Sequence, residues 1–123
     1  MPSILIIDDD ESLRDGLRRT LHKEGYTIME ASDGGRALKQ LESQPVDLIL
    51  LDMFMPDKDG LETIGALRRT HPGIRVIAMS GGGFKGKIDV LDVAKMLGAR
   101  RTLTKPFTRE QLLEVVEMEL ARP

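Results

Sequence analysis

The chain has 123 residues, with 18 basic and 20 acidic side chains and a formal net charge of −2. This length fits one domain, residues 1–123, that can bury a hydrophobic core. The balanced charge and the 3% of aromatic residues argue against direct binding to nucleic acid, which favours a basic excess or aromatic stacking.

Cysteine is absent, so disulfides and thiolate metal sites are excluded, in keeping with the cytoplasmic location that we expect. No apolar run approaches the roughly 18 residues of a membrane span, and we therefore expect no insertion into a membrane.

Five short apolar segments are predicted to be strands. In chain order they are residues 3–7, 26–30, 47–51, 74–79 and 101–104. The first, third and fourth are rich in Ile, Leu and Val, which is typical of strands that are buried on both faces of a parallel sheet.

The segments between the strands show helical spacing of apolar residues. Leu13, Leu17 and Leu21 recur every four residues, and Gly25 then provides a C-terminal stop. Asp33 is expected to cap the second helix.

Three further helices complete the pattern. One is predicted around residues 61–67, and the next, over residues 88–97, is closed by Gly98. The last opens with Thr108, and Gln111 three residues later gives the signature of a capping box. Strand and helix thus alternate five times, which predicts an α/β fold with a doubly wound parallel sheet and helices on both faces.

Polar residues follow four of the five predicted strands. They are Asp8, Asp9 and Asp10 after the first strand, Asp52 after the third, Ser80 after the fourth and Lys105 after the fifth. In an open parallel sheet, ligands bind beyond the carboxyl ends of the strands, where these side chains would converge. Asp10 is expected to cap the helix that follows it.

The converging residues indicate phosphoryl transfer. Gathered carboxylates repel one another unless a cation neutralises them, and oxygen ligands suit Mg²⁺. Asp52 would attack phosphorus, Lys105 and Mg²⁺ would offset charge on the transferring oxygens, and Ser80 would hydrogen-bond one of them. The alternative is a sheet edge without a chemical role.

Four motifs carry a resemblance to a known family. The stretches "ILIIDDDESLR", "LILLDMFMPDKDG", "VIAMSG" and "LTKPFT" resemble the response-regulator receiver domain, the phosphoacceptor module of two-component signalling. The resemblance covers essentially the whole chain. It implies a flavodoxin-like five-stranded sheet in the order 2-1-3-4-5 with five helices.

The resemblance also implies a role for each site residue. Asp8 and Asp9 match the acidic pair, with Asp9 the more direct Mg²⁺ ligand, and Asp52 matches the phosphorylated aspartate. The backbone carbonyl of Phe54 would complete the metal site. Two further matches are Ser80, the hydroxyl that reorients towards the phosphoryl group, and Lys105, the lysine that precedes a proline.

The family implies partners rather than a substrate. A histidine kinase or a phosphotransfer protein would donate the phosphoryl group, and a downstream protein target or a missing output domain would receive the signal. Such a domain is not a classical enzyme, because it catalyses only its own phosphorylation and dephosphorylation.

The sequence departs from the family pattern at three places. Thr102 stands where the family has the aromatic residue of its switch. The loop of residues 80–87, "SGGGFKGK", has four glycines in eight residues, and we expect it to become ordered when phosphate arrives. Phe54 stands where many members have a polar residue, which predicts slow loss of the phosphoryl group.

Two other functions fit part of the pattern. A phosphatase of the haloacid-dehalogenase type would use Asp8 as its nucleophile, but the chain lacks room for a cap domain. A pseudo-receiver would bind a partner without phosphorylation, and Thr102 is compatible with that role.

Overall fold

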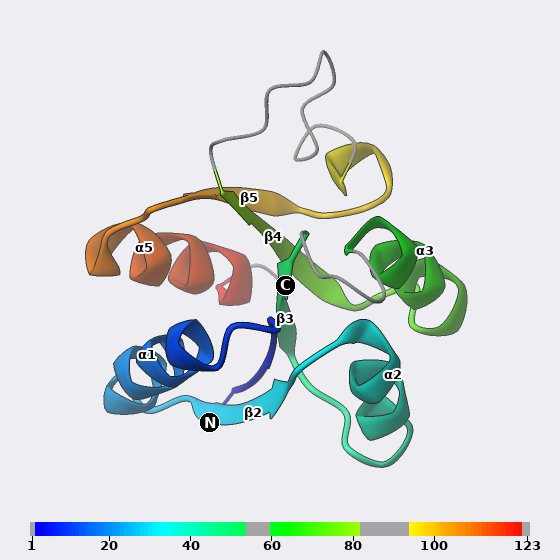
Figure 1. Ribbon diagram of the computed structural model, residues 1–123, viewed down its shortest axis with the longest axis horizontal. Coiled ribbons are helices and arrows are strands. Elements are labelled where there is room, and N and C mark those ends of the chain that lie inside the picture. The colour runs from blue at the N-terminus through cyan, green and yellow to red at the C-terminus, as the bar shows by residue number, and fades with distance from the viewer. Residues whose placement is uncertain (1, 54–59, 82–93, 122–123) are drawn as a thin grey trace.

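Residues 2–53, 60–81 and 94–121 are described by the structure, a computed structural model. The strands are β1 (Ser3–Ile7), β2 (Thr27–Ala31), β3 (Leu48–Asp52), β4 (Arg75–Gly81) and β5 (Arg101–Lys105). They pair in parallel in the order β2-β1-β3-β4-β5. Figure 1 shows this sheet with helices on both faces, so the predicted fold class is confirmed.

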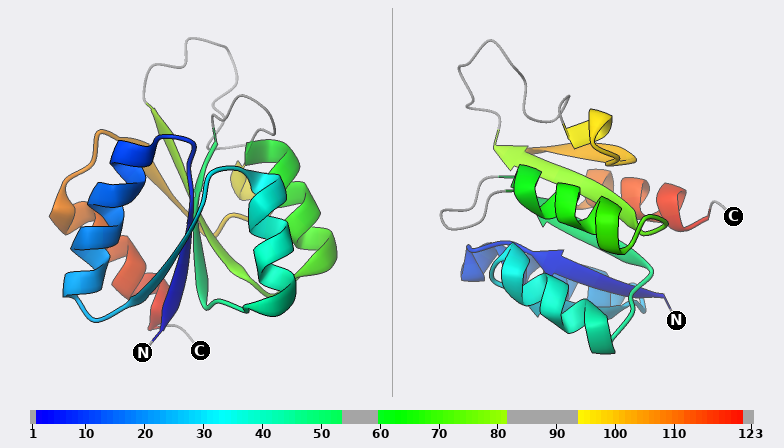
Figure 2. Two further views of the ribbon diagram at one scale, coloured as in Figure 1. Left: turned by 60° about the horizontal axis from the view of Figure 1, so that its bottom comes forward. Right: turned by 90° about the vertical axis from the view of Figure 1, so that its right-hand side faces the viewer.

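Helices flank the sheet in two layers. Their bounds are α1 (Glu11–Lys23), α2 (Gly34–Ser43), α3 (Gly60–Thr70) and α5 (Arg109–Leu120). Most of the helix predicted over residues 88–97 falls outside the described residues, but residues 94–96 are helical. In Figure 2, α1 and α5 cover one face of the sheet, and α2 and α3 cover the other. None of the helices in the described ranges is long and apolar enough to cross a membrane.

The predicted helix caps are present. Asp10, Asp33 and Thr108 are N-caps whose side chains accept a backbone N–H three residues on, and Thr108 forms the full capping box with Gln111. At the end of α1, Gly25 has a φ of 97° and donates its N–H to the His22 carbonyl. This left-handed residue ends the helix at low steric cost, as the sequence predicts.

The buried side chains form one core on each face of the sheet. The α2/α3 core contains Leu5, Ile7, Ala31, Ala37, Leu41, Ile49, Leu51, Met53, Ile64, Leu67, Val76, Ala78, Ala94 and Ala99. The α1/α5 core contains Ile4, Ile6, Leu17, Leu21, Leu48, Leu50, Ile77, Met79, Leu103, Leu112, Leu113 and Val116. Alternate residues of the central strands enter opposite cores, which explains why these strands are apolar at nearly every position.

β1 has the predicted bounds, residues 3–7, but β2, β3, β4 and β5 each extend past the predicted end. β3 ends on Asp52, β4 includes Ser80 and β5 ends on Lys105. The prediction ended these strands one or two residues earlier because it treated the first polar residue as the end of the strand. The ladder continues past that point, since Asp52 is in register with Met79.

Candidate functional site

The period of two along a strand sets where the acidic side chains point. Asp8 comes two residues after Ile6, and Asp52 comes two residues after Leu50, so both continue the row of side chains on the α1/α5 face. They are 1% and 4% exposed, respectively. Two carboxylates are therefore buried at the carboxyl ends of neighbouring strands.

Local hydrogen bonds orient the segment after β1. The Asp8 backbone N–H donates to the Ala31 carbonyl of β2, at 3.1 Å. The Asp10 N–H donates to Asp8 Oδ1 at 2.9 Å, while Asp10 Oδ1 accepts from the Leu13 N–H at 3.1 Å. These bonds leave Asp9 exposed at the turn between strand and helix.

Lys105 brings a positive charge to the two buried acids. Its Nζ lies 3.2 Å from Asp8 Oδ2 and 3.3 Å from Asp52 Oδ1. Lys105 follows Leu103 by two residues, so the same alternation directs it to the α1/α5 face. Its side chain is 22% exposed, so a buried ion-pair network is joined to solvent through the lysine.

The acidic residues have the geometry of a cation site. One carboxylate oxygen each from Asp8, Asp9 and Asp52 lies within 4.8 Å of the others. Oxygen donors of this kind suit Mg²⁺. With Lys105 counted, the cluster carries two net negative charges, which one divalent cation would neutralise. The residues present therefore fit Mg²⁺.

Ser80 and Thr102 occupy neighbouring strands. Ser80 is 3% exposed, and its hydroxyl donates to the Gly81 carbonyl at 3.1 Å. Thr104 is its register partner in β5, and Thr102 is half-buried opposite Ala78. Ser80 therefore lies at the same end of the sheet as the acids, but alternation directs its side chain away from their row.

The structure brings together four of the predicted site residues, Asp8, Asp9, Asp52 and Lys105, through the distances given above. Phe54 lies outside the described residues, as do residues 82–87 of the glycine-rich loop. The predictions made for the Phe54 carbonyl, for its ring and for the loop stay predictions.

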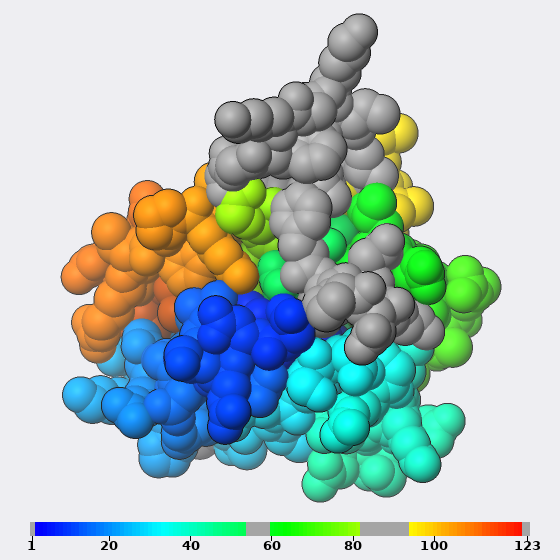
Figure 3. All heavy atoms as spheres, in the orientation of Figure 1, coloured from blue at the N-terminus to red at the C-terminus, as the bar shows by residue number. Residues whose placement is uncertain are grey.

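Segments far apart in the sequence meet at this end of the molecule. On the face seen in Figure 3, the blue residues at the start of α1 lie between the orange residues around the start of α5 and the cyan residues around α2. This arrangement follows from the strand order, because β1 lies inside the sheet between β2 and β3, and its carboxyl end faces the loops of its neighbours.

Two residues beside the acids were missed by sequence reasoning. Arg14 Nη1 donates to the Asp8 carbonyl at 2.6 Å, and Arg14 Nε lies 3.3 Å from Glu30 Oε1 in β2. The available signal was the position of Arg14 in the first turn of α1, where side chains lean back towards the helix N-terminus. Glu30 gave no such signal, because it pairs with Arg14 only in the folded chain.

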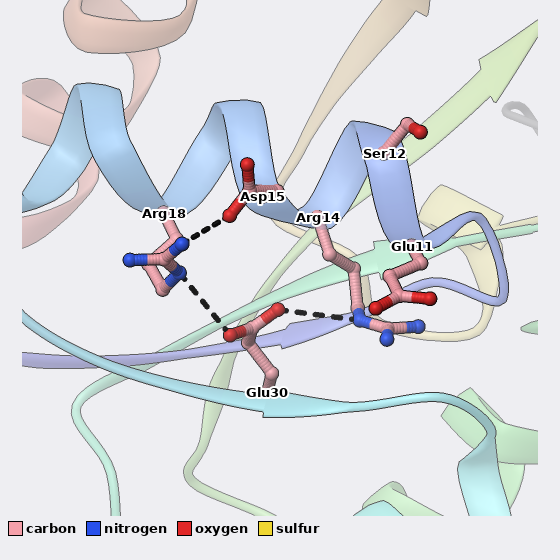
Figure 4. A pocket seen from close by; sticks show the side chains of 6 residues that line it. All are labelled: Glu11, Ser12, Arg14, Asp15, Arg18 and Glu30. Carbon is pink, nitrogen blue, oxygen red and sulfur yellow. Dashed lines mark hydrogen bonds and ion pairs between the residues drawn. The ribbon is translucent and has the colours of Figure 1, made fainter.

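Arg14 and Glu30 also line an open groove between α1 and β2. Its volume is about 710 Å³, and its lining residues are Glu11, Ser12, Arg14, Asp15, Arg18 and Glu30. Figure 4 shows Arg14 and Arg18 on α1 reaching the Glu30 carboxylate from two sides. Five of these six lining residues are charged and the sixth, Ser12, is polar, so the groove is not an apolar pocket.

A family model and curated relatives match this chain over almost its full length. The model of the response regulator receiver domain matches residues 4–117. The transcriptional regulatory protein CpxR of Escherichia coli K12 is 36% identical over 122 residues, which are 99% of this chain and 50% of that protein. Sporulation initiation phosphotransferase F of Bacillus subtilis is 35% identical over 117 residues, 95% of this chain and 92% of that protein.

Solved structures agree with these matches. The receiver domain of NtrX from Brucella abortus superposes with a TM-score of 0.90 at 30% identity, covering 98% of this chain and 99% of that one. The chemotaxis protein CheY4 of Vibrio cholerae gives 0.86 at 28% identity, covering 96% and 98%. The chain spans about half the length of CpxR and of the response regulator MprA from Mycobacterium ulcerans.

Proposed function

This chain belongs to the response regulator receiver domain family, and on that premise we propose that Asp52 accepts a phosphoryl group from a histidine kinase or a phosphotransfer protein. The observation that carries the proposal is the Lys105 ammonium, which lies within 3.3 Å of both buried carboxylates, Asp8 and Asp52. A fixed cation beside a carboxylate nucleophile stabilises charge where the phosphoryl oxygens gather in the transition state.

The reaction needs one bond to form and one to break. A carboxylate oxygen of Asp52 attacks phosphorus, and the bond between phosphorus and the donor's imidazole nitrogen breaks. The electron pair of that bond stays with the imidazole, which takes up a proton as it leaves. The product on this chain is an acyl phosphate at Asp52.

Mg²⁺ is the cofactor that the acidic cluster would hold through Asp8, Asp9 and Asp52, with the predicted Phe54 carbonyl as a further ligand. When bound, Mg²⁺ supplies charge neutralisation at the phosphoryl oxygens. The chain's own residues fix the geometry, since the hydrogen bonds of Asp8 and the β3–β4 ladder at Asp52 hold the carboxylates before the donor arrives.

Ser80 and Thr102 are proposed to report the phosphorylated state. The Ser80 hydroxyl would exchange its bond with the Gly81 carbonyl for one to the phosphoryl group. Thr102 cannot act as the usual aromatic switch, because its side chain is small and half-buried opposite Ala78. The changed surface would be read by a downstream protein or by an output domain in the same polypeptide, with residues 1–123 acting as one receiver domain.

A small phosphodonor tests this function directly. Wild-type protein incubated with acetyl phosphate and Mg²⁺ should gain the mass of one phosphoryl group, and Asp52→Asn should not. EDTA should suppress the gain in wild type, because the acidic cluster then lacks its cation. Intact-mass spectrometry of the three samples, with circular dichroism to verify the fold of the variant, provides the readout.

The same assay, with Asp8→Asn added as a further sample, distinguishes the competing functions. A phosphorylated Asp52→Asn protein would contradict the proposal, and loss of the signal in Asp8→Asn alone would favour a phosphatase of the haloacid-dehalogenase type. A wild-type protein that takes up no phosphoryl group would indicate a pseudo-receiver.

A further inference from the structure

Arg14 links helix α1 to the backbone of the acidic segment. Its Nη1 donates to the Asp8 carbonyl at 2.6 Å, and its side chain is only 15% exposed. We propose that Arg14 is a positioning residue, which holds the peptide between Asp8 and Asp9 in the orientation that a Mg²⁺ site requires. This inference rests on the proposed function, because it assumes that these acids bind the cation.

An arginine suits this role because its guanidinium donates in two fixed directions. Nε lies 3.3 Å from Glu30 Oε1 while Nη1 donates to the Asp8 carbonyl. Glu30 belongs to β2 and is in register with Ile6 of β1, so the anchor is part of the same sheet as the acids. Arg14 therefore joins β2, through Glu30, to the Asp8–Asp9 peptide that follows β1.

The contact restrains a part of this segment that the other hydrogen bonds do not hold. The Asp8 N–H donates to the Ala31 carbonyl, and Asp8 Oδ1 accepts from the Asp10 N–H. These bonds hold the start of the turn and the Asp8 side chain. The Asp8 carbonyl begins the peptide to Asp9, whose exposed carboxylate has to turn towards Asp8 and Asp52. Holding this carbonyl fixes the path of the backbone into Asp9.

An effect of the Arg14 charge and an effect of its positioning role would change the affinity for Mg²⁺ in opposite directions. A guanidinium near three carboxylates repels Mg²⁺, so if charge alone mattered, Arg14→Met would bind Mg²⁺ more tightly. If positioning dominates, the same substitution weakens binding, because the ligands are no longer oriented before the ion arrives. Arg14→Lys keeps the charge but loses the two fixed donors, so it isolates the positioning effect.

Mg²⁺ titration of the unphosphorylated protein by calorimetry provides the measurement. We expect Arg14→Lys and Arg14→Met each to raise the dissociation constant for Mg²⁺ by about 10-fold. This is the lower end of the effect measured for residues that orient metal ligands. Arg18→Lys is the matched control, since Arg18 lies one turn further along α1 and pairs with the same Glu30 carboxylate, at 3.4 Å. It should bind Mg²⁺ as wild type does.

A further variant and a folding control distinguish the loss of positioning from misfolding. Glu30→Asp keeps every charge but shortens the anchor of Arg14, and it should also weaken Mg²⁺ binding. Thermal melts in EDTA compare the folds of all variants without the ion.

The inference is wrong if Arg14→Lys binds Mg²⁺ like wild type, if Arg14→Met binds it more tightly, or if Arg18→Lys is weakened to the same extent. Those results would leave the proposed function intact. A wild-type protein that binds no Mg²⁺ would instead contradict the proposed metal site, and the role of Arg14 with it.

Discussion

At the scale of single residues, Lys105 offsets part of the negative charge of the two acids that the sheet buries. Its ammonium lies 3.2 Å from Asp8 and 3.3 Å from Asp52. Burying two carboxylates close together is unfavourable unless positive charge accompanies them. Lys105 therefore stabilises the fold as well as the proposed reaction.

Replacing Lys105 with methionine should separate these contributions. We expect Lys105→Met to lower the free energy of unfolding by about 2 kcal/mol in EDTA, because two buried acids lose a hydrogen-bonded cation. Added Mg²⁺ should then raise its melting temperature more than that of wild type, since the ion substitutes for the ammonium. Thermal denaturation with and without Mg²⁺ measures both effects.

Lys39→Met, at an exposed position of α2, is the control and should change neither value. Equal stability of Lys105→Met and wild type in EDTA would show that the lysine contributes nothing to the fold.

The site residues differ in how well the sequence predicts them. The acids and Lys105 could be predicted because each ends or follows an apolar strand, and parallel strands bring their carboxyl ends to one edge. Arg14 could not, because its partners are a backbone carbonyl and a carboxylate on β2. Neither partner forms a pattern in the sequence, and only the paired strands bring them within reach.

At the scale of elements, the helix caps were predictable, whereas the carboxyl ends of every strand except β1 were not. Caps depend on residues within a few positions of one another, as for Asp33 and the Arg36 N–H. Strand ends depend on the neighbouring strand, so β3 continues to Asp52 because Met79 continues to pair with it. The local signal was the change from apolar to polar residues, and tertiary pairing overrides it.

The start of α3 is coupled to the site through a close approach of two backbones. A Cβ added to Gly60 would lie 2.5 Å from Met53 Cα, and Met53 directly follows Asp52. Gly65, on the same helix, has only Arg69 Nη1 within contact range, at 3.8 Å. These two glycines therefore provide a matched pair of substitutions.

Gly60→Ala should lower the free energy of unfolding by about 2 kcal/mol, because neither backbone can move aside without disturbing the packing. It should also slow phosphorylation, since Met53 shifts with its neighbour Asp52. Gly65→Ala should raise stability by about 0.5 kcal/mol through its higher helix propensity. Urea denaturation and the rate of phosphorylation test both expectations, and equal behaviour of the two variants would contradict the coupling.

At the scale of the whole molecule, the two ends of the sheet differ in role. The carboxyl ends of the strands carry the proposed site, and the opposite end carries a cluster of ion pairs that holds α5 in place. Glu119 of α5 is 1% exposed and lies opposite the site, at the starts of β4 and β5. Its carboxylate pairs with Arg100 at 2.6 Å and Arg101 at 3.0 Å, and its backbone carbonyl accepts from Arg75. This cluster ties α5 to β4 and to the edge strand β5.

Glu119→Gln should therefore destabilise the fold without altering the site. We expect a loss of about 2 kcal/mol, less than for a fully buried pair because the arginines reach solvent. The Mg²⁺ dissociation constant should stay at its wild-type value, because Lys105 and the acids lie at the other end of the strands. Glu114→Gln, an exposed acid of the same helix, is the control and should leave stability unchanged. A changed Mg²⁺ affinity in Glu119→Gln would show that the two ends are coupled.

The central claim is that Asp52 carries the phosphoryl group, and mapping the modified residue tests it most directly. Borohydride reduces an acyl phosphate to an alcohol, so a phosphorylated aspartate becomes homoserine and can be located by peptide mass spectrometry. After treatment with acetyl phosphate and Mg²⁺, homoserine should appear at position 52 and at no other aspartate. Homoserine at position 8, or none in the chain, would contradict the account.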